Sequence, residues 1–140
     1  MTIEQKRDQL IGRLSAIQSF HDRFAYVVEQ GKARPSLEAS LKNEKNKVDG
    51  CLSNLWFVPE FRDGRCYFAV DADSLIVKAI ASLLCDLYSG YSPREILPVD
   101  PSFLAQVGIT QHLSPNRRNS LSRVWDKIRI FALENSGAHG

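Results

Sequence analysis

Cysteine is the residue type in this sequence best suited to covalent chemistry, because its thiolate is both a nucleophile and a metal ligand. The chain has three cysteines, Cys51, Cys66 and Cys85, which are widely spaced. A zinc site normally shows closely paired ligands, as in C-x2-C, and no such pair is present. A disulfide framework in a short secreted chain favours an even number of cysteines. Each thiol is therefore considered alone, and no metal site is predicted.

Cys51 differs from the other two by its surroundings in "KVDGCLSNLWFV". It follows a polar segment and precedes an apolar run, and Gly50 allows the backbone to turn sharply beside it. Lys42, Lys45 and Lys47 are upstream cations that would favour the thiolate. Cys51 could be a nucleophile on a loop, half of a metal site, or a packed residue at the start of a strand. The missing paired ligand argues against the metal site, and the residues alone leave the other two roles open.

Cys66 and Cys85 have apolar neighbours. Cys66 alternates with Phe68 along a strand-like run, and Cys85 lies among leucines in a helix-like run. Free cysteine is among the most buried residue types in proteins. Both residues are therefore predicted to be packed, unreactive thiols.

Two further candidates lie close together in "QHLSPNRRNSL". His112 has no second histidine at metal-ligand spacing, which favours a hydrogen-bonded structural role. Arg117 falls in the first turn of a predicted helix, where the helix dipole disfavours a cation by about 0.3–1 kcal/mol. It belongs either to a solvated basic face or to a site for a carboxylate or another anion. Arg118 is expected to be solvated.

The segments before Cys51 are predicted to be two helices and a loop. Thr2 and Gln5 form a capping box for the first helix, Ser19 caps the second, and Gly31 suits the position just past its end. Residues 32–49 are polar and are predicted to form a long surface loop with one turn of helix at most. A loop of this length in a compact domain is often functional or mobile.

The segment after Cys51 has the pattern of a β-hairpin. Residues 53–58 and 65–70 are rich in aromatic and β-branched side chains and flank Asp63-Gly64, a strong signal for a hairpin turn. They are predicted to be antiparallel strands, with Pro59 ending the hydrogen-bond ladder of the first.

Helices are predicted for the rest of the chain. Asp71 or Asp73 can cap a helix over residues 75–88, which is apolar on nearly all sides and therefore buried. Three more helix starts combine a capping residue with a proline at the first helical position: Ser92-Pro93, Asp100-Pro101 and Ser114-Pro115.

The order of helices, two strands and further helices predicts an α+β domain over residues 1–135, in which a small antiparallel sheet is covered by helices. Residues 136–140 are predicted to be a disordered tail. A net charge of +2 gives no support to nucleic-acid binding, and no apolar run is long enough to span a membrane. No secretory signal is visible, so a cytoplasmic protein is expected.

Four stretches of the sequence together resemble the SufE family, the sulfur acceptors that activate cysteine desulfurases during iron–sulfur cluster assembly. They are "VDGCLSNLW" at 48–56, "DADSLIVKAIASLL" at 71–84, "YSPREIL" at 91–97 and "QHLSPNRRNSL" at 111–121. The resemblance runs in unbroken order from about residue 31 to residue 130. It implies a small curved antiparallel sheet packed against helices, similar to the fold of the IscU-type cluster scaffolds.

The resemblance implies that Cys51 is the sulfur acceptor, because it occupies the cysteine of the family pattern V-x-G-C-x-S-x-V-W. Gly50 and Ser53 match this pattern, whereas Leu52 stands where glutamine is common. Matches to the other family motifs imply residues that bind the partner or support the Cys51 segment; these are Asp71, Asp73, Lys78, His112 and Arg117, and Asn119 matches as well.

The function implied is that of an accessory carrier rather than an enzyme, with no cofactor. Persulfide transfer is thiol–disulfide exchange in form and needs one nucleophilic cysteine and no metal. The implied partners are a SufS- or CsdA-like cysteine desulfurase and a downstream cluster scaffold, without nucleic acid or membrane, and the chain is expected to be a monomer or weak dimer. Two alternatives remain: an IscU-like iron–sulfur scaffold, which needs several ligands around one site, and an interaction module with an idle thiol.

Overall fold

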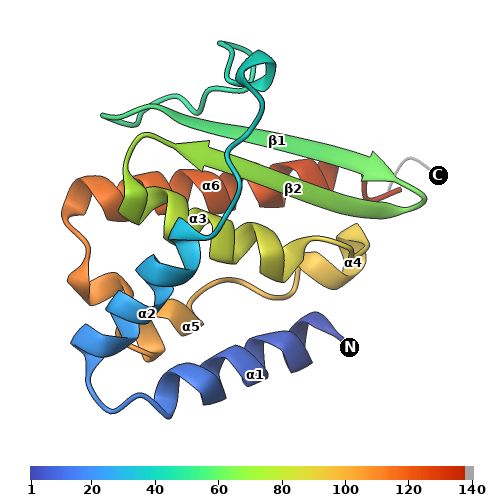
Figure 1. The fold of residues 1–140 in the computed structure, drawn as a ribbon. Coiled ribbons are helices and arrows are strands. Elements are labelled where there is room, and N and C mark those ends of the chain that lie inside the picture. The colour runs from blue at the N-terminus through green and yellow to red at the C-terminus, as the bar shows by residue number, and fades with distance from the viewer. Residues whose placement is uncertain (138–140) are drawn as a thin grey trace.

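The computed structural model describes residues 1–137 and places a β-hairpin on one side of a group of helices (Figure 1). The strands are β1 (Leu55–Arg62) and β2 (Arg65–Ala72). The helices are α1 (Ile3–Ser15), α2 (Phe20–Lys32), α3 (Leu75–Tyr88), α4 (Pro93–Ile96), α5 (Phe103–Gln106) and α6 (Pro115–Glu134), with 3-10 turns η1 (Ala39–Leu41) and η2 (Thr110–His112). The predicted α+β class is confirmed. Most of the predicted tail, residues 138–140, lies outside the described residues.

The hairpin forms where the sequence predicts it. β1 and β2 pair antiparallel along their whole length. Asp63 and Gly64 in the turn have φ values of 52° and 77°, as two-residue turns that match the twist of the strands require. β1 begins two residues later and ends four residues later than the predicted range 53–58, and β2 extends two residues beyond the predicted range 65–70.

The prediction that Pro59 ends the ladder of β1 is wrong, since Pro59 lies inside the strand opposite Phe68. The N–H groups of a strand alternate between its two edges. That of Phe57 points away from β2 and donates to the carbonyl of Asn46 at 2.8 Å. The nitrogen of Pro59, two residues further, faces the same outer edge, so its missing N–H breaks no bond to β2.

A short third segment, residues 46–48, pairs with this outer edge of β1. The N–H of Val48 donates to the carbonyl of Leu55 at 2.8 Å, and the bond from Phe57 to Asn46 follows it. The regular sheet of the described residues has two strands. On the other edge of the hairpin, Cys66 of β2 forms a second bridge with Tyr91, so the expected small sheet is a hairpin with one added bridge on each edge.

One face of the hairpin packs on α3 and α6, and α2 packs on α3 from another side (Figure 1). α3 is buried along most of its length, as predicted. At Gly31 of α2, an added Cβ would lie 2.3 Å from the Cβ of Ala79 in α3. The sequence predicts Gly31 just past the end of α2, but it lies in the last turn of this helix. Glycine is needed there because the two helices pack closely, and not because the chain reverses direction.

The helix starts follow the predictions with two exceptions. The predicted caps that form are Thr2 with Gln5, Ser19, Ser92 with Glu95, and Ser114. α3 is capped by Ser74 and not by Asp71 or Asp73. α5 begins only after Ser102, whose N–H donates to the side chain of Asp100 at 2.9 Å.

Residues 33–42, which we call the strap, leave α2 and cross the hairpin on the face turned away from the helices (Figure 1). They include the single helical turn expected there, η1. None of the helices within residues 1–137 has the length and apolar character needed to cross a membrane.

Candidate functional site

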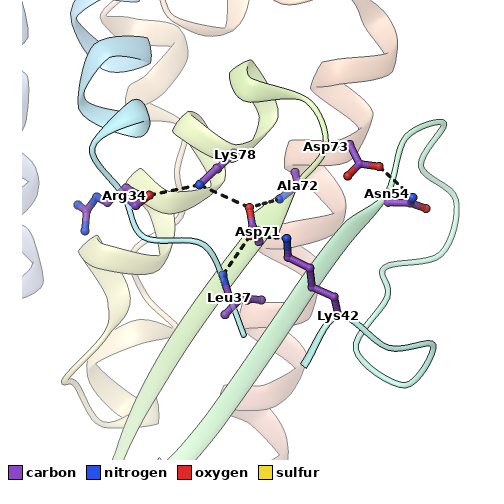
Figure 2. Close-up of polar contacts among 8 residues, drawn as sticks. All are labelled: Arg34, Leu37, Lys42, Asn54, Asp71, Ala72, Asp73 and Lys78. Atoms are coloured by element: carbon purple, nitrogen blue, oxygen red, sulfur yellow. Dashed lines mark hydrogen bonds and ion pairs between the residues drawn. The ribbon is translucent and has the colours of Figure 1, made fainter. Parts of the chain in front are cut away.

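Cys51 lies in a tight loop, residues 49–54, which we call the Cys51 loop. The bond from Val48 to Leu55 closes its base. At the β1 end, Asn54 forms two hydrogen bonds with Asp73, of which Figure 2 shows the one between the side chains. The N–H of Asp73 donates to the Asn54 carbonyl at 3.0 Å, and Asn54 Nδ2 donates to the Asp73 carboxylate at 2.9 Å.

The other end of the Cys51 loop is held by α6. Asn119 Nδ2 donates to the carbonyl of Gly50 at 2.9 Å. Gly50 has a φ of 83°, in the left-handed region that favours glycine. A Cβ added at Gly50 would lie 2.9 Å from Nη2 of Arg123, so the Arg123 guanidinium covers this position. The backbone conformation favours glycine here, and any larger residue would also displace the flexible Arg123 side chain.

The three thiols lie in different environments. Cys51 is half-buried and touches the edge of the core, whereas Cys66 (0% exposed) and Cys85 (2% exposed) lie inside it. Burial raises the pKa of the Cys66 thiol to about 11 and that of Cys85 to about 12. Neither is a thiolate near neutral pH, and the prediction that both are packed thiols is confirmed.

A hollow of about 480 Å³ opens beside the Cys51 loop, between the starts of α3 and α6. Its lining is rich in hydroxyl groups and consists of Leu52, Ser53, Ser74, Val77, Ser114, Asn116, Arg117 and Ser120. Arg117 is exposed and forms no ion pair with any carboxylate among residues 1–137. Leu52 is 84% exposed. The hollow thus places an unpaired cation and an exposed apolar side chain next to the Cys51 loop.

Asp71 is a buried carboxylate, 3% exposed, that gathers four donors (Figure 2). The N–H groups of Leu37 and Ala72 donate to it at 3.0 and 2.9 Å. The ammonium groups of Lys42 and Lys78 lie 3.1 and 3.6 Å from its oxygens. Burial by itself raises the pKa of Asp71, but these hydrogen bonds and charges outweigh it and lower the pKa below its ordinary value.

Asp71 and Lys78 are brought together, but they hold the strap rather than the Cys51 loop. Lys78 Nζ also donates to the carbonyl of Arg34 at 3.2 Å, and the Arg34 side chain pairs with Asp86 of α3. Of the two aspartates singled out in the sequence, only Asp73 contacts the Cys51 loop.

The sequence predicts that Lys42 favours a thiolate at Cys51, but its side chain contacts other groups. Its ammonium group is paired with Asp71 and lies 5.4 Å from the centre of the Trp56 ring. Lys45 and Lys47 line a separate hollow between β1 and the end of α6.

His112 and Arg118 have their contacts outside the Cys51 loop. His112 lies in η2 with its ring 5.7 Å from that of Phe24, and it does not line the hollow beside Cys51. Arg118, expected to be solvated, donates from Nη1 to the carbonyl of Leu113 at 2.6 Å and supports the turn before α6.

The sequence marks Asn119 only as a match to a family motif and assigns no role to Arg123, although both residues of α6 contact Gly50. Their spacing was a usable signal, because residues four apart on a helix share a face. What the sequence does not show is that this face meets a loop 69 positions earlier in the chain.

The fold and the site together define a small α+β domain that presents one accessible thiol, and residues 1–137 contain no group of three potential metal ligands. The profile of SufE, described as an Fe-S metabolism associated domain, matches residues 8–132. The chain belongs to the SufE family, which places it in iron–sulfur metabolism.

Two comparisons agree with this family. An uncharacterized SufE-like protein of Rhizobium meliloti (strain 1021) is 29% identical over 130 residues, which cover 89% of this chain and 93% of that protein. The solution structure of a hypothetical protein from Thermus thermophilus matches with a TM-score of 0.73 at 18% identity, covering 99% of this chain and 100% of that one. This second likeness shows the fold alone.

Proposed function

We propose that this protein is a sulfur acceptor, which takes persulfide sulfur from a cysteine desulfurase onto Cys51, stimulates that enzyme and passes the sulfur on for iron–sulfur cluster assembly. The observation that carries the proposal is the contrast among the three thiols of a SufE domain. Cys51 is accessible on a loop, while Cys66 and Cys85 are buried with raised pKa values.

In the proposed reaction, the Cys51 thiolate attacks the outer sulfur of a cysteine persulfide on the desulfurase. The S–S bond of that persulfide breaks, and its inner sulfur leaves as the partner's thiolate. A new S–S bond leaves the persulfide on Cys51, so the sulfur changes carrier without net oxidation or reduction. Stimulation follows because the desulfurase thiol is returned for another turnover. The protein is thus an accessory carrier without a cofactor.

The hollow beside Cys51 supplies the proposed contact with the desulfurase. Arg117 is suited to a carboxylate of the partner, because it is an exposed cation without an ion-pair partner among the described residues. Leu52 and Ser53 on the loop and the opening between α3 and α6 complete the surface. We place the reaction in the reducing cytoplasm, where free thiols persist, with the protein as a monomer or weak dimer.

An IscU-like scaffold is the alternative function. It would need further ligands beside Cys51, and within residues 1–137 the other two cysteines belong to the core. Reconstitution with iron and sulfide under anaerobic conditions separates the two functions. Visible charge-transfer absorption retained on Cys51 would favour the scaffold.

Intact mass spectrometry tests the sulfur acceptor directly. The protein is incubated with free cysteine and a SufS- or CsdA-like desulfurase, and the expected product carries one added sulfur atom. Cys51→Ser should lose both the added sulfur and the stimulation, while Cys66→Ala and Cys85→Ala keep them. Stimulation by Cys51→Ser equal to that of the wild type would overturn the proposal.

A further inference from the structure

The tip of the Cys51 loop is held only at its two ends. Within residues 1–137, Cys51, Leu52 and Ser53 form no hydrogen bond with backbone or side chains. The hydrogen bonds that position them belong to their neighbours, Gly50 on one side and Asn54 on the other.

These two ends are held unequally. Asn54 shares two hydrogen bonds with Asp73 and adjoins the bond that closes the loop at Leu55. Gly50 accepts a single hydrogen bond, from the exposed side chain of Asn119. Glycine also has the widest choice of backbone conformations. The Gly50 end is therefore the one that can open while the Asn54 end stays in place.

Asn119 and Arg123 act on the same residue from successive turns of α6. The amide of Asn119 holds the Gly50 carbonyl at 2.9 Å, and the guanidinium of Arg123 lies over the Gly50 Cα. Arg123 forms no ion pair with any carboxylate of the described residues, so a partner of its own does not explain its position.

Sulfur transfer requires a close approach of Cys51 to the persulfide of the partner. Reacting atoms must approach to roughly 3–3.5 Å with their orbitals aligned. A persulfide in an enzyme cleft can be reached only by a thiol that projects from its own protein. Cys51 is half-buried against its own core while Gly50 is held on α6.

We infer that Asn119 and Arg123 are positioning residues, which together form a latch that keeps the Cys51 loop docked on α6 and releases it when the partner binds. The role in transfer rests on the proposed sulfur-acceptor function. The latch itself is a property of the isolated protein and can be measured without a partner.

Alkylation of Cys51 by iodoacetamide in the isolated native protein measures the open population of the loop. Loss of one neutral hydrogen bond in Asn119→Ala should speed labelling of Cys51 roughly 2- to 10-fold. Labelling of Cys66 and Cys85 should not change, and the urea unfolding midpoint should fall by no more than the loss of this one hydrogen bond accounts for. Arg123→Ala should act in the same direction, and Asn119→Gln, which keeps the amide donor, should restore a slow rate.

Ser122→Ala is the matched control, because Ser122 is an exposed residue of the same helix whose side chain forms no hydrogen bond within residues 1–137. It should label at the wild-type rate. An unchanged rate in Asn119→Ala would overturn the latch, as would faster labelling in Ser122→Ala.

Titration of a desulfurase tests the release step. If the desulfurase binds only the open form of the Cys51 loop, its apparent affinity for the protein equals the intrinsic affinity multiplied by the open fraction. Half-maximal stimulation should then require a roughly 2- to 10-fold lower concentration of Asn119→Ala than of the wild type, and a higher one would overturn the release. Faster alkylation without sulfur loading on either protein would keep the latch and reject the proposed function. Sulfur loading with an unchanged alkylation rate in Asn119→Ala would keep the proposed function and reject the latch.

Discussion

The strap and the Cys51 loop are two irregular segments that flank the same hairpin, yet they are anchored in opposite ways. The strap is fixed by the buried carboxylate of Asp71, which binds a backbone N–H and Lys42 of the strap. The Cys51 loop has an unbonded tip, and its Gly50 end is held by one exposed amide, that of Asn119.

The difference shows how one small fold separates a fixed segment from a releasable one. Hydrogen bonds to a charged group contribute about 1.5–3 kcal/mol each, and neutral ones about 0.5–1.5 kcal/mol. Breaking the strap contacts takes two of its four donors from a buried charge, whereas opening the Gly50 end leaves only groups that water can reach. We therefore expect the Cys51 loop to open without unfolding and the strap to open only with the fold.

The largest contrast between the two segments is expected in thiol reactivity. Cys85 lines a hollow beneath residues 34–37 of the strap, and its pKa of about 12 leaves roughly one thiolate in ten thousand at pH 8. In a native time course at pH 8, iodoacetamide should label Cys51 orders of magnitude faster than Cys85, as read by peptide mass. Fast native labelling of Cys85 would mean that the strap opens readily and would break the comparison.

Replacing the carboxylate that anchors the strap should cause the next largest effect. Asp71→Asn should lower the free energy of unfolding by about 2–4 kcal/mol, because it leaves Lys42 and Lys78 near a group without charge. The loss should be limited because the two lysine side chains are 33% and 13% exposed. Urea unfolding at pH 7 measures it. Asp73→Asn is the control, since Asp73 is exposed and an amide can still accept from Asn54.

The difference in stability between the wild type and Asp71→Asn should depend on pH. The pKa of Asp71 is lowered in the folded protein from the ordinary value of 3.8, so its stabilisation is present above that value. It is lost as the pH falls through the folded pKa. The advantage of the wild type over Asp71→Asn should therefore shrink below about pH 4, and an advantage that stays constant into strong acid would contradict the assigned role.

Glycine replacements sharpen the comparison at the Cys51 loop. Alanine in the left-handed region costs about 1–2 kcal/mol. Gly64→Ala in the hairpin turn carries this strain alone, because φ is 77° and no atom lies within 4 Å of the added Cβ. Gly50→Ala carries the strain and also displaces Arg123.

Because the Cys51 loop can open to relieve its strain, Gly50→Ala should lose no more stability than Gly64→Ala in urea unfolding. It alone should speed alkylation of Cys51. A larger stability loss in Gly50→Ala would show that the loop is a rigid part of the fold.

The smallest effect on stability is expected at Arg117. Arg117→Ala should leave the melting temperature unchanged or raise it slightly, since it removes a cation from a helix start at a cost of about 0.3–1 kcal/mol. It should still weaken stimulation of the desulfurase, by about 1.5–3 kcal/mol if a buried charge-assisted hydrogen bond is lost.

The neighbouring Arg118 is unsuitable as a control for Arg117. Arg118→Ala should lower the free energy of unfolding by about 1 kcal/mol, because it removes the hydrogen bond to the Leu113 carbonyl. Lys127→Ala, an exposed cation on the same helix, serves instead. Equal stimulation by Arg117→Ala and Lys127→Ala would assign Arg117 to a solvated basic face.

Features coded by neighbouring residues could be predicted from the sequence. The turn at Asp63-Gly64, the caps at Ser92 and Ser114 and the burial of Cys85 follow from short patterns. Pro59 and Gly31 were misread, because their roles depend on which strand edge or which helix faces them. Which strand edge or helix faces a residue is set by tertiary packing, and no pattern in the neighbouring sequence indicates it.

The candidate site divides in the same way. Gly50 and Cys51 stand out by local sequence and by their likeness to a family motif. The bond from Asn119 to Gly50 and the pairing of Lys42 with Asp71 join distant segments, and neither residue type demands these partners. Only the folded chain shows that one carboxylate serves the strap and one amide serves the Cys51 loop.

A persulfide formed on Cys51 would have no resolving thiol within its own chain. A second thiolate that attacked its inner sulfur would form a disulfide and release hydrosulfide. Cys66 and Cys85 cannot play that part in the folded protein, because both are buried and protonated at neutral pH. No other thiol of the folded chain would therefore discharge that persulfide, and the sulfur would leave only when an external thiol reacts with it.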